Sequence, residues 1–183
     1  MRASRLGVRR GRRCFSQLSH VSGTLPRMVD VGEKAVTDRR AVAECVVRLP
    51  AQVWALLEGS DIASPKGPVF ATATVAGVGG AKKTSELIPF CHALNLEDCQ
   101  IRIAPSSRRD GDLDVRCEVR THSKTGAEME ALTGAATAAL CVYDMCKAVS
   151  SDIVVSDIRL VEKSGGKSDK NFSSSSSSRE DPT

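Results

Sequence analysis

The 183-residue sequence predicts an α+β fold in which an antiparallel sheet is covered by helices on one face. Short segments rich in β-branched residues predict the strands, because such side chains pack well on a pleated surface. Longer segments rich in Ala, Leu, Met and Glu predict the helices. Along the chain these segments follow the order strand, helix, helix, strand, strand, helix, strand.

The first half of the domain contains one strand and two helices. Residues 42–49 mix β-branched and polar side chains and predict a half-buried strand. Residues 50–59 predict a short helix, since Pro opens the segment and Gly closes it. A loop is expected over 60–68. Residues 69–89 predict a second helix, whose continuity is in question at the glycine-rich patch 77–80.

The second half contains a hairpin, a long helix and a last strand. Residues 96–104 and 113–121 alternate like strands, and the turn-forming residues 105–112 join them. A helix is expected over 127–150, followed by a strand over 153–161. This order, with antiparallel strands and helices packed on one face, predicts a ferredoxin-like fold. A stripe of alanines along the long helix would permit close packing on the sheet or on another subunit.

Charge and composition argue against a nucleic-acid or membrane protein. Seven of the 26 basic residues lie within residues 1–27, so the rest of the chain has 19 basic and 22 acidic side chains. A mildly acidic domain with only 3% aromatic residues lacks both the basic face and the stacking platforms of nucleic-acid readers. Seven cysteines without a Cys-x-x-Cys pair indicate reduced thiols and no zinc site. No apolar run is long enough to cross a bilayer, so we expect a soluble protein.

The two ends of the chain differ from the domain between them. Residues 1–27 are rich in Arg and free of acid, which is typical of a mitochondrial transit peptide. We expect the mitochondrial matrix as the location, with plastid or cytosol as alternatives, and a basic tail before a functional start at Met28 as the other interpretation. Residues 170–183 include six consecutive serines and predict a disordered tail. The domain should therefore span 28–169.

Several charged residues allow a structural and a functional interpretation. Asp144 and Lys147 are three apart on a helix and would form either an exposed ion pair or a catalytic pair. Glu128 and Glu130 lie near the start of that helix, where carboxylates complement the helix dipole. His92 would be either a packed residue or an acid–base group.

Lysines beside glycine or hydroxyl residues recur along the chain. Ammonium groups, hydroxyls and exposed backbone N–H groups together suit a phosphate. None of these segments has the spacing of a P-loop, so they predict a general anion site and not an ATPase. They lie at 66–67, 82–84, 124–126 and 163–168.

Six blocks in order make the chain resemble the MoaC family, the cyclic pyranopterin monophosphate synthases of molybdenum cofactor biosynthesis. The resemblance covers residues 28–169 and leaves only the tails unmatched. The blocks are MVDV (28–31), KGxVFATA (66–73), LIPxCH (87–92), KTGxEMEALT (124–133), YDMCKAV (143–149) and KSGGKS (163–168).

The resemblance implies a lyase that converts a 3′,8-cyclised dihydro-GTP to cyclic pyranopterin monophosphate and pyrophosphate. It also implies functional coupling to the radical-SAM GTP cyclase that makes this substrate, and a hexamer of three dimers with sites at dimer interfaces. Matching positions make Lys66, His92, Asp144 and Lys147 catalytic. They assign substrate binding to Asp30, Arg39, Cys91, Glu128, Met129, Glu130 and Lys163.

The chemistry fits these residue types. Opening and reclosing a purine-derived ring needs proton transfer, which Asp144 and a lysine of depressed pKa, Lys147, could supply. Binding of a triphosphate requires cationic side chains to neutralise its charge. No redox cofactor is required by a rearrangement and elimination; Mg²⁺ on the substrate phosphates would be compatible, although no ligand motif indicates it. The competing class is a non-catalytic ferredoxin-like binding module, which would not need these charged groups together.

Overall fold

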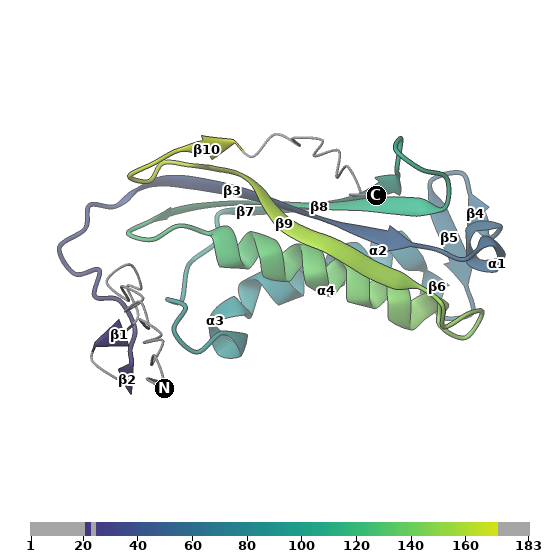
Figure 1. Ribbon diagram of the computed structural model, residues 1–183, viewed down its shortest axis with the longest axis horizontal. Helices are drawn as coiled ribbons and strands as arrows, with labels where there is room; N and C mark the ends of the chain where they lie inside the picture. The colour runs from purple at the N-terminus through teal and green to yellow at the C-terminus, as the bar shows by residue number, and fades with distance from the viewer. Residues whose placement is uncertain (1–20, 23–24, 172–183) are drawn as a thin grey trace, which may run out of the picture.

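The fold is organised on a five-stranded antiparallel sheet (Figure 1). The computed structural model describes residues 21–22 and 25–171. In spatial order the strands are β10 (Lys170–Asn171), β9 (Val154–Ser164), β3 (Thr37–Arg48), β8 (Asp112–Ser123) and β7 (Asp98–Pro105). Numbered along the chain, the four long strands therefore lie in the order 4-1-3-2. This order confirms the predicted ferredoxin-like fold.

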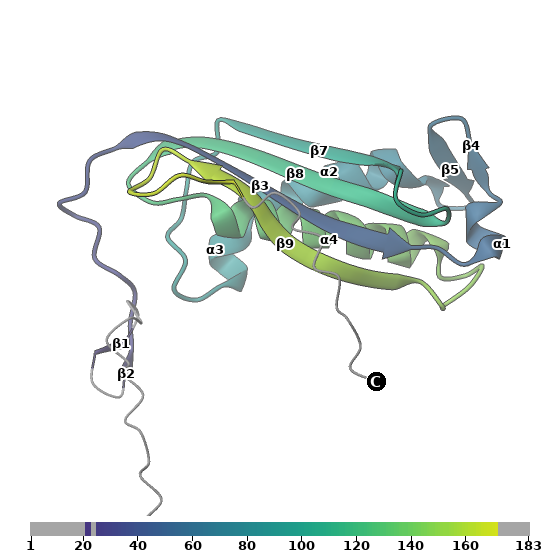
Figure 2. The same ribbon diagram turned by 45° about the horizontal axis from the view of Figure 1, so that its top comes forward.

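Two long helices, α2 (Val69–Lys82) and α4 (Glu128–Cys146), lie side by side against one face of the sheet (Figures 1 and 2). Glycines let them approach closely. A Cβ atom on Gly80 would lie 2.3 Å from the Thr137 hydroxyl, and one on Gly77 would lie 3.0 Å from the Gly134 carbonyl oxygen. The glycine-rich patch therefore does not interrupt α2, and two of its glycines, Gly77 and Gly80, are packing positions against α4.

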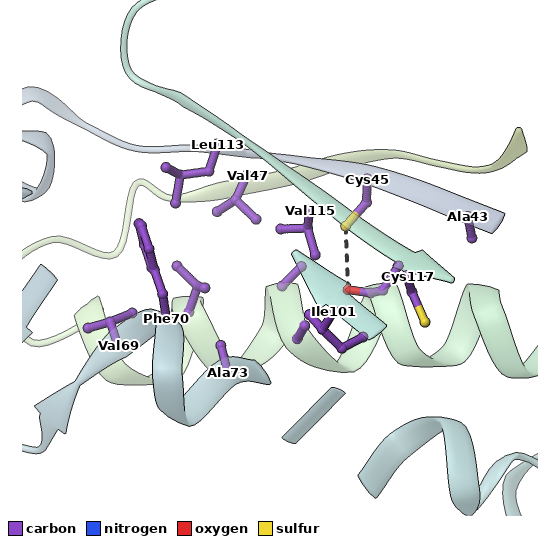
Figure 3. Packing of buried hydrophobic residues seen from close by; sticks show 14 of the residues in the cluster. Ala43, Cys45, Val47, Val69, Phe70, Ala73, Ile101, Leu113, Val115 and Cys117 are labelled. Atoms are coloured by element: carbon purple, nitrogen blue, oxygen red, sulfur yellow. Dashed lines mark hydrogen bonds between the residues drawn. The ribbon is translucent and has the colours of Figure 1, made fainter. Parts of the chain in front are cut away.

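The core lies between the helices and the inward side chains of the sheet (Figure 3). Alternate residues of β3 and β8 point to the helices, as the period of two requires. The Cys45 thiol also donates a hydrogen bond to the Ala135 carbonyl oxygen of α4 at 3.4 Å. Each buried Val or Leu contributes roughly 1.5–3 kcal/mol. Core residues labelled in Figure 3 include Ala43, Val47, Leu113, Val115, Cys117, Phe70 and Ile101.

The opposite face of the sheet carries ion pairs, and no described helix covers it. Arg40 forms salt bridges with Glu118 and Glu162, and Glu44 forms them with Arg116 and Arg159. The Arg40 hydrogen bond lowers the pKa of Glu118.

Residues 50–68 fold differently from the prediction. The helix α1 covers only Ala51–Trp54, and Leu57–Glu58 (β4) pairs with Asp61–Ser64 (β5), which pairs in turn with Gly67–Pro68 (β6). Gly59 has φ +61° and turns the chain between β4 and β5. The expected helix 50–59 and the expected loop 60–68 were therefore wrong in part.

Other boundaries shift by a few residues. The predicted helix 69–89 breaks at Lys83, and α3 (Thr84–Leu87) follows. The helix expected to reach residue 150 ends at Cys146. At the far end β10 extends the ordered domain two residues beyond 169.

The N-terminal part contributes one small ladder, β1 (Val21–Ser22) with β2 (Leu25–Pro26). Residues 1–20 and 23–24 of the predicted transit segment, and the serine-rich tail from residue 172, lie outside the described residues. None of the helices in the described part of the chain combines the length and apolar character that a bilayer crossing requires.

Candidate active site

The first part of the site is a hollow of about 570 Å³ at the N-terminal end of α4. Three segments that are distant in sequence form it: the chain before β3, the loop after α3, and the first turn of α4. Its size suits a drug-sized or nucleotide-sized ligand. The lining residues are Val29, Val31, Lys34, Ile88, Pro89, Phe90, Cys91, His92, Thr125, Gly126, Glu128 and Met129.

A second hollow of about 530 Å³ adjoins the first and shares Lys34, Thr125 and Gly126 with it. Four cationic side chains line it, those of Lys34, Arg39, Lys124 and Lys167, against one acid, Glu33. This balance of charge and donors suits a polyanion.

Hydrogen bonds between the surrounding segments fix the walls of this second hollow, called the basic hollow below for its four cationic side chains. Arg39 donates to the Lys124 carbonyl oxygen at 3.3 Å, and the Lys124 ammonium donates to the Gly32 carbonyl oxygen at 2.6 Å. Thr37 donates to the Gly165 carbonyl oxygen at 2.7 Å. The Arg39 side chain lines this hollow, while its buried Nε has no hydrogen-bond partner within the described residues.

Glu128 and Glu130 differ in environment although they lie two residues apart. Burial opposes ionisation of Glu128, but the ammonium of Lys163, 2.9 Å away, lowers the pKa of this carboxyl overall. Glu130 is only 2% exposed, and burial raises its pKa. Its Oε2 has no hydrogen-bond partner among the described residues. Glu130 is therefore a buried carboxyl and not a solvated group at the start of α4.

Cys91 and His92 bring the loop after α3 to the same hollow. The Cys91 thiol lies 3.7 Å from Glu130 Oε1, and burial together with the charge of Glu130 raises the pKa of Cys91 to about 11. A thiol of this kind is a packing and hydrogen-bonding group and not a nucleophile.

His92 is oriented by the chain that precedes β3. Its Nε2 donates a hydrogen bond to the Val29 carbonyl oxygen at 2.8 Å, which holds the ring in the wall of the hollow. Asp30 lies next to Val29 and accepts a hydrogen bond from the Gly32 N–H at 2.8 Å, so it shapes the turn before Lys34.

A third group, formed by Lys66, Asp144 and Lys147, lies at the other end of α4. The Asp144 carboxylate contacts the ammonium groups of Lys66 at 2.8 Å and Lys147 at 2.7 Å. Lys66 also donates to the Asp144 carbonyl oxygen at 2.9 Å. All three side chains are about half exposed.

The electrostatics of this cluster correct one expectation. The hydrogen bonds from Lys147 and then Lys66 lower the pKa of Asp144 to about 2. The pKa of Lys147 is raised and not depressed, because the hydrogen bond and charge of the Asp144 carboxylate stabilise the ammonium more than desolvation opposes it. In the isolated chain the pair is therefore ionised.

The predicted site residues thus fall into two groups at opposite ends of one helix. Glu128 and Asp144 are separated by 16 residues of α4, which at ~1.5 Å per residue corresponds to about 24 Å. Lys66, Asp144 and Lys147 line neither hollow, so a ligand bound in the two hollows of one chain does not meet this group. Within the described residues no group of three or more His, Cys, Asp or Glu side chains is arranged to hold a metal ion.

Sequence reasoning missed two residues of this arrangement. Lys34 lines both hollows, but a single lysine in an irregular segment carries no recognisable pattern. Asp61 binds the first turn of α2 from a neighbouring strand, in a region that was expected to be a loop.

Comparisons with known proteins match this chain to the MoaC family over residues 28–166. A protein of Xanthomonas oryzae pv. oryzae named cyclic pyranopterin monophosphate synthase is 49% identical over 155 residues, covering 84% of this chain and 93% of the relative. A Synechocystis protein named molybdenum cofactor biosynthesis bifunctional protein is 49% identical over 146 residues, covering 79% of this chain.

Some relatives are much longer than the matched region. The chain covers 42% of the Synechocystis protein. It covers 27% of a Drosophila melanogaster protein named molybdenum cofactor biosynthesis protein 1, to which it is 45% identical over 158 residues. The matched residues contain the four long strands, both long helices and both groups of site residues, and the chain therefore belongs to the MoaC family.

Proposed function

We propose that this protein is a cyclic pyranopterin monophosphate synthase of molybdenum cofactor biosynthesis. The observation that carries the proposal is the family match over residues 28–166, together with 49% identity across 93% of a relative of that name. In enzyme terms it is a pyrophosphate-releasing phosphorus–oxygen lyase acting on (8S)-3′,8-cyclo-7,8-dihydroguanosine 5′-triphosphate.

The basic hollow supports binding of the triphosphate. When a substrate hydroxyl attacks the α-phosphorus, the bond to the β-phosphate oxygen breaks and negative charge grows on the leaving pyrophosphate. Cations such as Arg39, Lys34 and Lys167 would stabilise that charge. Mg²⁺ on the phosphates would add to this effect.

The ring rearrangement requires groups that donate and accept protons. Burial raises the pKa of Glu130 and so favours its protonated form, whereas the Lys163 ammonium lowers the pKa of Glu128 and favours its ionised form, so the two carboxyls suit opposite roles in proton transfer. Lys147 could act as a base only after its ammonium loses the stabilisation that Asp144 gives it. Burial of the cluster by substrate and a second subunit would favour this change, because burial disfavours the charged form of lysine.

We therefore infer that each site is shared by two copies of the chain. The separation of about 24 Å within one chain, and the half-exposed Lys66, Asp144 and Lys147, support this arrangement. The N-terminal end of α4 in one copy would face the C-terminal end of α4 in another. A trimer of dimers would satisfy this requirement with closed symmetry.

Two wider proposals follow from the chain and its relatives. The bifunctional name of the Synechocystis relative supports coupling to another enzyme of the same pathway, for which a radical-SAM GTP cyclase has the required product. The arginine-rich residues 1–27 support delivery to the mitochondrial matrix. A reporter carrying residues 1–30 should then be imported into mitochondria, and a reporter that stays cytosolic would remove this part of the proposal.

The function is tested by turnover. Purified protein should convert the cyclised dihydro-GTP to cyclic pyranopterin monophosphate and pyrophosphate, measured by mass spectrometry and by a pyrophosphate assay. The Lys147→Ala variant should keep its circular dichroism spectrum and lose turnover. Absence of product from correctly assembled wild-type protein with authentic substrate would refute the function.

A further inference from the structure

Asp61 binds the first turn of α2 although it belongs to β5. Its Oδ1 accepts hydrogen bonds from the backbone N–H groups of Ile62 at 2.6 Å and Phe70 at 2.7 Å. Its Oδ2 accepts one from the Ala71 N–H at 3.2 Å. A single carboxylate thus ties strand β5 to the start of a helix that begins eight residues later in the chain.

The helix needs this contact because its own first residues cannot supply one. The first N–H groups of a helix have no partner within it, and a Ser, Thr, Asp or Asn side chain at the preceding position commonly accepts from them. Pro68 occupies that position in α2 and makes no side-chain hydrogen bond to the helix. Asp61 therefore takes over the capping role from a neighbouring element.

The contact lies at the base of the hairpin that carries Lys66. In this hairpin Ala63 pairs with Pro68 and Ser64 pairs with Gly67. At its tip Ser64 Oγ donates to the Gly67 carbonyl oxygen at 2.9 Å and accepts from the Lys66 N–H at 3.2 Å. Asp61 thus fixes one end of the hairpin and Ser64 fixes the other.

The position of this hairpin brings Lys66 to α4. From the tip its ammonium contacts both the carboxylate and the carbonyl oxygen of Asp144. The Asp61 carboxylate also lies near the last turn of α4, where burial raises the pKa of the Cys146 thiol and the charge of Asp61 adds to the rise. From β5, Asp61 therefore contacts α2 and lies near the end of α4 that carries Asp144 and Lys147.

We propose that Asp61 is a positioning residue for the reaction, which acts by holding the Lys66 hairpin against the C-terminal end of α4. This rests on the proposed function for the role given to Lys66. Loss of the carboxylate would leave the Phe70 and Ala71 N–H groups to water and release β5 from α2. Displacement of a reacting group by about 1 Å can cost on the order of a hundredfold in rate.

The first test separates positioning from helix capping. Asp61→Ala should lower kcat about tenfold to a hundredfold and lower the melting temperature by about 2–4 °C. Adding Pro68→Asp places a capping carboxylate directly before the helix, at backbone angles (φ −68°, ψ 125°) that an N-cap residue adopts. The double variant should regain the melting temperature but not kcat. Recovery of both would show that Asp61 only caps α2.

The second test asks whether Asp61 acts through Lys66. In a Lys66→Ala background, Asp61→Ala should cause no further loss of kcat, because the group that it positions is gone. The control Glu58→Ala removes the exposed cross-strand neighbour of Asp61 and should leave kcat unchanged. An equal loss of kcat in both backgrounds would overturn the proposal.

A third measurement does not depend on turnover. Loss of the Lys66 contact in Asp61→Ala should raise the pKa of Asp144 above its value of about 2, as followed by carboxyl NMR titration, while Glu58→Ala leaves it there. An unchanged pKa of Asp144 in Asp61→Ala would refute the positioning role. If wild-type protein shows no turnover, the proposed function fails, and this titration still decides whether Asp61 positions Lys66.

Discussion

If two copies share each site, two inactive variants should restore one another when they assemble together. Glu128→Gln removes a group from the N-terminal end of α4, and Lys147→Ala removes one from the C-terminal end. Within one chain these ends are about 24 Å apart, so the two substitutions damage different halves of the proposed site. Each variant alone should lose activity, because every site in its assembly contains the altered half.

The size of the recovery follows from symmetry. Random pairing of equal amounts gives roughly half mixed dimers, and each mixed dimer has two sites related by a twofold axis. One of these sites combines both altered halves, and the other combines both unaltered halves. The mixture should therefore show roughly a quarter of wild-type activity.

The assay is coexpression of the two variants with different affinity tags, followed by measurement of product formed per total protein. Two copies of the same variant with different tags provide the control and should remain inactive. Recovery no greater than the sum of the two separate variants would refute a shared site. It would indicate that each chain builds its own site.

Three further predictions concern packing and titration. Gly80→Ala should lower the free energy of unfolding by about 1–3 kcal/mol, because its Cβ would lie 2.3 Å from Thr137 Oγ1. Gly79→Ala, which would place its Cβ with no atom within 4 Å, should raise the free energy of unfolding by up to about 1 kcal/mol. Denaturant unfolding measures both values, and equal effects would contradict the packing. Burial raises the pKa of Glu130 above its unfolded value, so its contribution to stability is lost as pH rises from about 4. Glu130→Gln should therefore raise the melting temperature more at pH 8 than at pH 4, and an equal rise would contradict this assignment. Lys163→Met should raise the pKa of Glu128, shifting the acid limb of kcat/KM to higher pH; an unmoved limb would exclude Glu128 as the titrating group.

The long elements of the fold could be predicted because their patterns are local and repeated. In β3 and β8 alternate residues such as Cys45 and Val115 point to the helices, and this alternation is visible in the sequence. The prediction of a helix over 50–59 was wrong in part, because Gly59 is compatible with both a helix end and a hairpin turn. Ten residues do not contain enough periods to distinguish these two structures.

The candidate site was predicted as a set of residues but not as an arrangement. The helix predicted over 127–150 places Glu128 and Lys147 near its two ends, but the sequence does not show which other segments of the chain meet each end. Asp61 carried no motif, because a cap supplied by another strand depends on tertiary contact. The raised pKa of Lys147 likewise depends on its side-chain rotamer, which places the ammonium against the Asp144 carboxylate at the protein surface.

A structure of the assembled protein with the cyclised dihydro-GTP, or a non-hydrolysable analogue, tests the shared site most directly. It should show one ligand that contacts Arg39 and Glu128 of one copy and Lys66 and Lys147 of a second copy. A ligand held by one end of α4 alone, with Lys66 and Lys147 facing solvent, would contradict the account.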